Sequence, residues 1–129
     1  MDLSTATPAY NKRLVERSRL QTQVMKLIAD YRLDALVYPH QKQLVCKVGG
    51  SQNERKGVLG SVTGFPSICV QAGFSTPSET APIGVPIGVE ILGRPFSEAT
   101  LIEIAYSFEQ AAPHRKPPLS APPLRSGPA

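Results

Sequence analysis

The sequence predicts an α/β fold with a small sheet. Apolar residues recur with helical spacing in two stretches, residues 10–31 and 97–112. Between them, three short apolar runs at residues 34–39, 67–74 and 85–93 have the length and residue types of strands. A helix that leads directly into a fully apolar strand is typical of α/β proteins. We therefore expect an N-terminal helix, a strand, a short helix, an antiparallel strand pair and a C-terminal helix.

The first helix is predicted over residues 10–31 by an apolar stripe. At spacings of i, i+4, i+7, i+8 and i+11, the stripe consists of Leu20, Val24, Leu27, Ile28 and Tyr31. Pro8 suits the entry to this helix because the first N–H groups of a helix have no partner within it. We expect residues 1–9 to form a flexible N-terminus.

The next elements are a strand and a short helix. Residues 34–39 (DALVYP) form a continuous apolar run that Pro39 stops, which predicts a strand buried on both faces. Residues 40–53 have no clear pattern. Asn53 can cap a short helix that runs to about Thr63 and ends at Gly64.

Residues 67–74 and 85–93 both alternate as strands do. The ten residues between them contain no helical pattern, so the two strands are predicted to pair antiparallel as a hairpin. Pro86 must then lie near a strand end or on a free edge. Cys69 lies in the first strand and is interpreted as a small buried hydrophobe.

The last helix and the tail complete the chain. Ser97 is the expected N-cap and Glu98 the acid of the first turn. The core stripe is expected to consist of Leu101, Ile104, Ala105, Phe108 and Ala112. Pro113 ends the helix, and residues 113–129, with six prolines, are predicted to be a disordered tail. Residues 10–112 are thus the predicted domain of this 129-residue chain.

Charge and composition exclude several functions. The net charge is +4, with ten Lys and Arg against five Asp and Glu in residues 1–60. The basic helix also carries acids, which favours a solvated face over a nucleic-acid or membrane surface. A binder of nucleic acid or of an acidic surface through this helix is the third alternative, and it predicts binding that weakens steeply with salt. No apolar run is long enough to span a membrane, and no secretory leader is recognised. The two cysteines favour a reducing cytoplasm. His and Cys lack metal-ligand spacing, and no cofactor motif occurs, so we expect neither metal nor cofactor.

Individual residues do not predict an active site. Ser51 follows Gly49 and Gly50, but the strand-to-helix elbow of a hydrolase nucleophile is missing, and Gly-Gly-Ser is ordinary turn chemistry. The two histidines, His40 and His114, are expected in exposed loops. Glu90 lies in the middle of a predicted strand, where a structural salt bridge or a sheet edge is favoured over acid–base catalysis.

Several motifs, taken in order, resemble the C-terminal part of amidase signature enzymes. They lie at residues 34–39, 52–55 (QNER), 63–68 (TGFPSI), 72–74 (AGF) and 85–96 (VPIGVEILGRPF). The resemblance covers about residues 10–118. It implies part of an α/β/α sandwich around a mixed sheet, from a family that hydrolyses or transfers amide groups.

The resemblance also implies which part of the enzyme is absent. The family's catalytic lysine and two serines lie in a Gly/Ser-rich signature N-terminal to this region, and no residue here matches them. We therefore expect no catalytic residue in this chain, which would be a C-terminal amidase segment that is inactive alone. The alternative is a non-catalytic subunit that completes a separately encoded N-terminal half.

The family's substrate funnel suggests a few pocket residues and partners. Gln52, Asn53, Arg55 and Leu59 correspond to a part of the family near that funnel, where they would shape the pocket or simply pack. The expected partner is the missing N-terminal amidase part, or a second copy bound through exposed sheet edges. Neither nucleic acid nor a membrane is expected as a partner.

Overall fold

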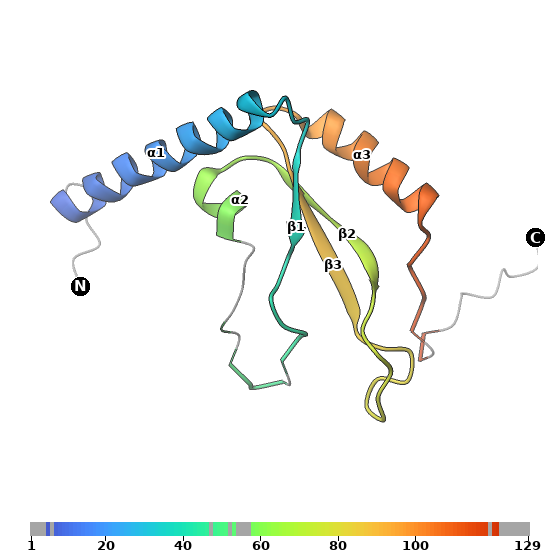
Figure 1. Ribbon diagram of the computed structural model, residues 1–129. Helices are drawn as coiled ribbons and strands as arrows, with labels where there is room; N and C mark the ends of the chain where they lie inside the picture. The colour runs from blue at the N-terminus through green and yellow to red at the C-terminus, as the bar shows by residue number, and fades with distance from the viewer. Residues whose placement is uncertain are drawn as a thin grey trace, which may run out of the picture.

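The computed structural model describes residues 5, 7–46, 48–51, 53, 58–118, 120 and 121. In chain order these contain α1 (Pro8–Asp30), β1 (Leu36–Pro39), α2 (Val58–Thr63), β2 (Ser67–Phe74), β3 (Pro86–Leu92) and α3 (Glu98–Ala111). The central strand is β3, which pairs antiparallel with β1 on one side and β2 on the other. Figure 1 shows α1 and α3 extending in opposite directions from one end of the sheet. The predicted α/β class and order of elements are confirmed.

Helix α1 begins at a side-chain cap. The Thr7 hydroxyl accepts a hydrogen bond from the Tyr10 N–H at 3.3 Å, and Pro8 is the first helical residue, two positions earlier than predicted. The helix ends as Arg32 turns back with a φ of 51°, and the Leu33 N–H donates to the Ile28 carbonyl. Among the described residues, no helix has the length and apolar character that a membrane crossing needs.

Only part of the predicted stripe of α1 is buried. Val24 and Ile28 pack with Phe65 and Leu92 in one core cluster. Leu27 and Tyr31, which the spacing assigned to the same stripe, remain 43% and 70% exposed. The helix meets the rest of the molecule along a narrow strip, so the flanking positions gain no apolar neighbour to cover them.

Strand β1 is not buried on both faces, contrary to the sequence prediction. Val37 is 63% exposed because β1 is an edge strand and α3 packs chiefly over β2. Its outer residues therefore lack the second covering layer that a fully apolar run normally indicates.

Helix α2 is short and is tied to α1. It ends as predicted at Gly64, which has a φ of 72° and donates to the Gly60 carbonyl. The Thr63 carbonyl accepts hydrogen bonds from Gln21 at 2.7 Å and from Arg17 at 3.4 Å. These side chains satisfy an end of α2 that has no helical partner. The expected cap, Asn53, is separated from Val58 by residues 54–57, which lie outside the described residues.

The β2–β3 hairpin forms as predicted. Pro86 is the first residue of β3, where its missing N–H costs no interior ladder bond. Ser75 closes the loop twice, because its N–H donates to the Val85 carbonyl at 2.9 Å and its hydroxyl accepts from the Val85 N–H at 3.0 Å.

Helix α3 packs on the face of the sheet that is opposite to α1. Leu101 and Ala105 are buried against Val70 and Ile91, which confirms the core of the predicted stripe. Ser97 occupies the predicted N-cap position of α3, but its side chain makes no capping hydrogen bond. The Ser97 hydroxyl donates to the Arg94 carbonyl at 2.7 Å, so it is engaged with the preceding turn and caps no helical N–H.

The chain after α3 lies against the body over its first residues. The His114 ring is 6.4 Å from the Phe108 ring, and the Lys116 ammonium is 5.6 Å from the centre of the Phe74 ring. Residues 113–118 contain neither helix nor strand. Disorder further along the tail stays a prediction, since residues 122–129 lie outside the described residues.

Candidate functional site

One face of the sheet changes from apolar to polar along its length. We call it the α1 face, because α1 and α2 pack on it. The antiparallel register places Leu36, Leu92 and Ser67 side by side across the three strands, and then Tyr38, Glu90 and Cys69. The next row contains His40, whose N–H donates to the Gly88 carbonyl, and Gln71. Side chains directly opposite one another point to the same side of a sheet. The second and third rows therefore bring titratable groups from all three strands together.

Glu90 is the buried charge of this face. It is 4% exposed, and its carboxylate Oε2 lies 3.1 Å from His40 Nδ1. A buried carboxylate requires a partner, because desolvation without one is costly. The salt-bridge interpretation of Glu90 is thus supported, whereas its placement at a sheet edge is wrong, since β3 is the central strand. His40 is 43% exposed, so it joins this buried charge to the surface.

Tyr38 and Cys69 flank the carboxylate in the same row. Burial first, and then the Glu90 charge and hydrogen bonding to it, raise the pKa of the Tyr38 hydroxyl. The hydroxyl oxygen is nevertheless buried without a hydrogen bond of good geometry. Partial burial and then the Glu90 charge also raise the pKa of the Cys69 thiol. Both groups are therefore held in their protonated forms.

Cys69 lies at the surface, which corrects its interpretation as a buried hydrophobe. The cause is its position in the row: within the described residues, no helix covers the α1 face beyond α2, and Cys69 points to that side. Its sulfur leans over Gly88 and would lie 2.7 Å from a Cβ at that position. Gly88 thus leaves the space that the thiol occupies.

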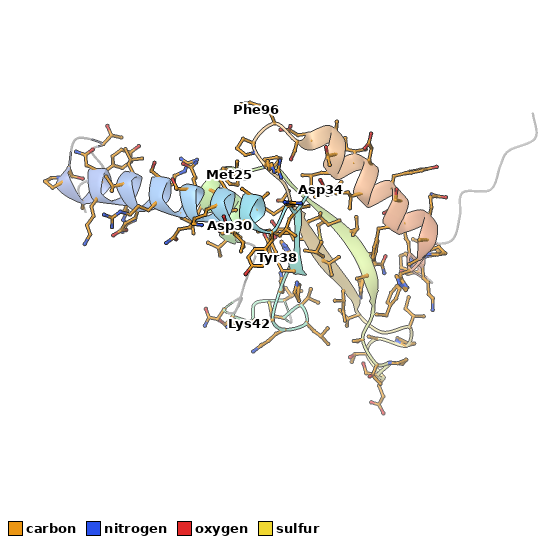
Figure 2. The ribbon with its side chains drawn as sticks, turned by 45° about the horizontal axis from the view of Figure 1, so that its top comes forward. Met25, Asp30, Asp34, Tyr38, Lys42 and Phe96 are labelled. Carbon is orange, nitrogen blue, oxygen red and sulfur yellow. The ribbon has the colours of Figure 1, made fainter. Side chains whose placement is uncertain are left out.

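A second glycine allows α2 to sit on the carboxylate. A Cβ at Gly60 would lie 3.1 Å from Glu90 Oε1 and 3.0 Å from Ser67 Oγ. The bare backbone at Gly60 therefore approaches the buried charge closely. Figure 2 shows Tyr38 on β1 between the end of α1 and the loop that carries Lys42.

A pocket of about 410 Å³ opens over the third row. Its wall on one side is the loop after β1, from His40 to Val45, and on the other side the start of β3. Cys69 and Gly88 also line the pocket. The pocket combines apolar walls with the ring of His40, which the buried Glu90 holds in place.

Of the four predicted pocket residues, the structure describes Asn53 and Leu59, and neither lines this pocket. The Asn53 N–H donates to the Ser51 hydroxyl at 3.3 Å within an exposed loop, and Leu59 packs against the core cluster of α1. Gln52 and Arg55 lie outside the described residues. Within the part of the chain that the structure describes, no cluster of His, Cys, Asp and Glu has the geometry of a metal site.

The His40–Glu90 pair is the feature that sequence reasoning missed. The two residues are 50 positions apart, so no local motif joins them. The one available signal was the charge of Glu90 in the middle of an otherwise apolar strand, because a buried carboxylate has to find a donor.

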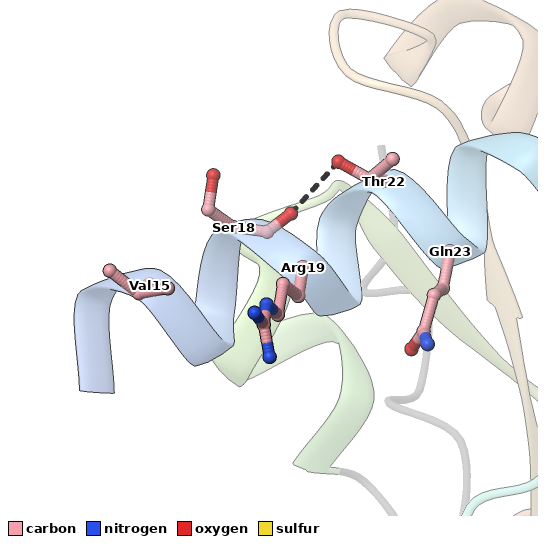
Figure 3. Close-up of a pocket in the computed structure, with 5 residues that line it drawn as sticks. All are labelled: Val15, Ser18, Arg19, Thr22 and Gln23. Carbon is pink, nitrogen blue, oxygen red and sulfur yellow. Dashed lines mark hydrogen bonds between the residues drawn. The ribbon is translucent and has the colours of Figure 1, made fainter. Parts of the chain in front are cut away.

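A groove on α1 is a weaker candidate. It is lined by Val15, Ser18, Arg19, Thr22 and Gln23, all from one helix (Figure 3). The Thr22 hydroxyl bonds within the helix to the Ser18 carbonyl at 3.0 Å. Because its described lining residues all belong to α1, no second helix or strand of the described chain contributes a ligand contact, and we do not treat the groove as a binding site.

Comparison with known proteins gives matches to amidases and amidotransferase subunits, each over a part of the relative's length. No protein-family model matches the chain. A probable amidase of Arabidopsis thaliana is 34% identical over 103 residues, which are 80% of this chain and 18% of that protein. A glutamyl-tRNA(Gln) amidotransferase subunit from Oceanobacillus iheyensis is 30% identical over 115 residues, or 83% of this chain and 22% of that protein.

Solved structures agree with the sequence matches. The crystal structure of PAM12A superposes with a TM-score of 0.71 at 29% identity, and the native peptide amidase of Stenotrophomonas maltophilia with 0.67 at 28%. Each match covers 91% of this chain and 23% of the solved chain. The chain therefore spans about a fifth of the length of the relatives it matches.

Proposed function

We propose, from the premise that this chain is related to the amidase signature enzymes in sequence and fold, that it is the C-terminal segment of an amidase-like hydrolase of carboxamide C–N bonds. The observation that carries the proposal is the pattern of coverage. Four fifths of this chain aligns with less than one fifth of the Arabidopsis amidase. Such a pattern is expected of one segment of a larger fold.

The proposed role of these residues is structural support. The sequence holds no Gly/Ser-rich stretch with paired serines and a lysine, so the chain's own residues supply no nucleophile for amide hydrolysis. The second and third rows of the α1 face offer the protonated groups of Tyr38 and Cys69 and the histidine His40, held by Glu90, which can position a neighbouring segment or ligand. Two free cysteines suit a reducing compartment, and we place this function in the cytoplasm.

The direct test is an activity assay on the 129-residue chain. We expect no release of ammonia or amine from aryl and aliphatic amides above the buffer rate. The family's catalytic serines and lysine are assigned to a segment that this chain lacks. Turnover that persists after replacement of every lysine in the chain would contradict that assignment.

A second candidate is a protein that completes a separately encoded amidase half. The observation in its favour is the exposure of large apolar residues on a chain that spans about a quarter of its structural relatives, with Val37 at 63% and Phe96 at 95%. Co-expression with a polypeptide that carries the Gly/Ser signature, followed by size exclusion, tests it. Co-elution supports this candidate, and separate elution at all concentrations contradicts it.

A further inference from the structure

We propose that the chain's own C-terminal tail closes the pocket over the third row of the α1 face, with Leu124 seated against the apolar wall of that pocket. The occupant is the segment 122–125 (PPLR), which lies outside the described residues. Pocket and tail both belong to this chain, so the inference does not depend on the proposed amidase function.

The pocket presents apolar surface that a leucine can cover. Its volume is about 410 Å³. Leu44 and Val45 line it from the loop after β1, and they are 50% and 68% exposed. Pro86 lines it from the start of β3 and is exposed as well. An apolar side chain docked here would remove part of this surface from water, which is favourable.

The described part of the tail leads toward this pocket. The Lys116 ammonium lies 5.6 Å from the centre of the Phe74 ring. Phe74 pairs with Pro86 across the hairpin, and neighbouring strands are about 5 Å apart. The tail therefore reaches a point about one strand away from a residue that lines the pocket. It then changes direction in a turn, in which the Ala121 N–H donates to the Pro118 carbonyl at 3.0 Å.

The length and composition of the following segment suit the pocket. Two consecutive prolines favour an extended polyproline helix with a rise of about 3.1 Å per residue, so residues 122–125 can span about 12 Å. That length exceeds the spacing of the two paired strands. Leu124 is the large apolar side chain of this segment. Because so proline-rich a segment cannot bury a core of its own, its order has to come from docking on the rest of the chain.

The chain's own tail is favoured over the same segment of a second copy. A second copy loses translational and rotational freedom when it binds. The tail is tethered close to the pocket, and a short flexible tether gives an effective concentration in the millimolar range. A contact that is too weak to hold two copies together can therefore still hold the tail.

Cys69 reports whether the pocket is covered, because it lines the pocket and is exposed in the described structure. In the full-length Cys46→Ser variant Cys69 is the only thiol, and its alkylation by iodoacetamide can be followed alone. Adding Leu124→Asp should speed this alkylation about fivefold, which corresponds to a loss of about 1 kcal/mol of docking free energy. Ser126→Asp adds the same charge to the tail but keeps the leucine, so it should leave the rate unchanged.

Two further controls use the other thiol and a peptide. In the Cys69→Ser background only Cys46 remains, which is exposed and outside the lining of this pocket, so Leu124→Asp should not change its alkylation. A synthetic peptide with the sequence of residues 117–129, added to the full-length Leu124→Asp chain, should restore the slow alkylation of Cys69 in a saturable manner. The same peptide with Leu124→Asp should not restore it.

The alternative outcomes separate the possible occupants. Equal rates of Cys69 alkylation with and without Leu124→Asp would overturn the proposal and support the disordered tail that the sequence predicts. Protection of Cys69 that increases with the concentration of the chain would also overturn it, because the pocket would then be covered by a second copy.

Discussion

At the scale of single residues, the Tyr38 hydroxyl lacks a hydrogen-bond partner in the row that it forms with Glu90 and Cys69. It is buried beside Glu90 without a well-formed hydrogen bond. A buried donor without a partner costs about 1–3 kcal/mol, so Tyr38→Phe should leave stability unchanged or raise it by about 1 kcal/mol at neutral pH. Urea unfolding measures this, with Tyr106→Phe on the exposed side of α3 as the control. A clear loss of stability would mean that Tyr38 donates to Glu90 in solution.

The raised pKa values of Tyr38 and Cys69 make the free energy of unfolding depend on pH in the alkaline range. In the unfolded chain these groups lose their protons near their ordinary pKa values of 10.0 and 9.0, whereas the folded state retains the protons to higher pH. The folded state then binds more protons, so the free energy of unfolding falls as pH rises above about 9. The denaturant midpoint of the wild type should fall more steeply with pH than that of Tyr38→Phe. Parallel curves would contradict this assignment.

Phe96 has a strained backbone conformation, and its side chain makes little packing contact that would offset the strain. Its φ is 62° and its side chain is 95% exposed at the turn before α3 (Figure 2). A left-handed conformation costs an L-residue about 1–2 kcal/mol, a cost that glycine avoids. Phe96→Gly should therefore be about 1 kcal/mol more stable than Phe96→Ala, which loses the ring but keeps a Cβ. Equal stabilities of the two variants in urea would show that the turn relaxes without cost.

At the scale of elements, the β2–β3 loop depends on Gly84. Its φ is 81°, and a Cβ there would clash with the Ser75 carbonyl oxygen. Gly49 has the same φ but open space around its Cβ position. Gly84→Ala should cost about 2–3 kcal/mol and Gly49→Ala about 1 kcal/mol, because only the first adds a backbone clash to the conformational penalty. Thermal unfolding of both variants compares the losses, and equal losses would contradict a role for the clash.

The elements themselves were predictable, and much of their burial was not. Local periodicity and turn residues identified β2 over its full length, the C-terminal end of α2 and both ends of α3 to within a residue or two, because these signals lie within each segment. The exposure of Val37, Leu27 and Cys69 depends on which layers cover the sheet. The His40–Glu90 pair depends on register between strands that are far apart in sequence. Both are tertiary properties that no single segment encodes.

At the scale of the whole molecule, the surface is larger than the mass requires. The chain exposes 10246 Å², whereas a compact monomer of 13.9 kDa exposes about 6,700 Å². Figure 1 shows one contribution: α1 projects well beyond the three-stranded sheet, on which α1 and α2 pack from one side and α3 from the other. The arrangement agrees with a segment whose neighbours belong to a larger fold.

The open edge at β1 predicts how the chain behaves without such neighbours. β1 is an edge strand, and an exposed apolar edge pairs readily with another strand. We expect the chain to self-associate in sedimentation velocity, with an apparent mass that rises with concentration. Val37→Lys should weaken this association at least about tenfold, because a charge on the edge has to be desolvated on pairing. Ile102→Lys, at a position of α3 with similar exposure (62% against 63%), should leave it unchanged. If both variants weakened association equally, or if the wild type remained monomeric throughout, the β1 edge would not be the interface, and a partner would have to dock elsewhere.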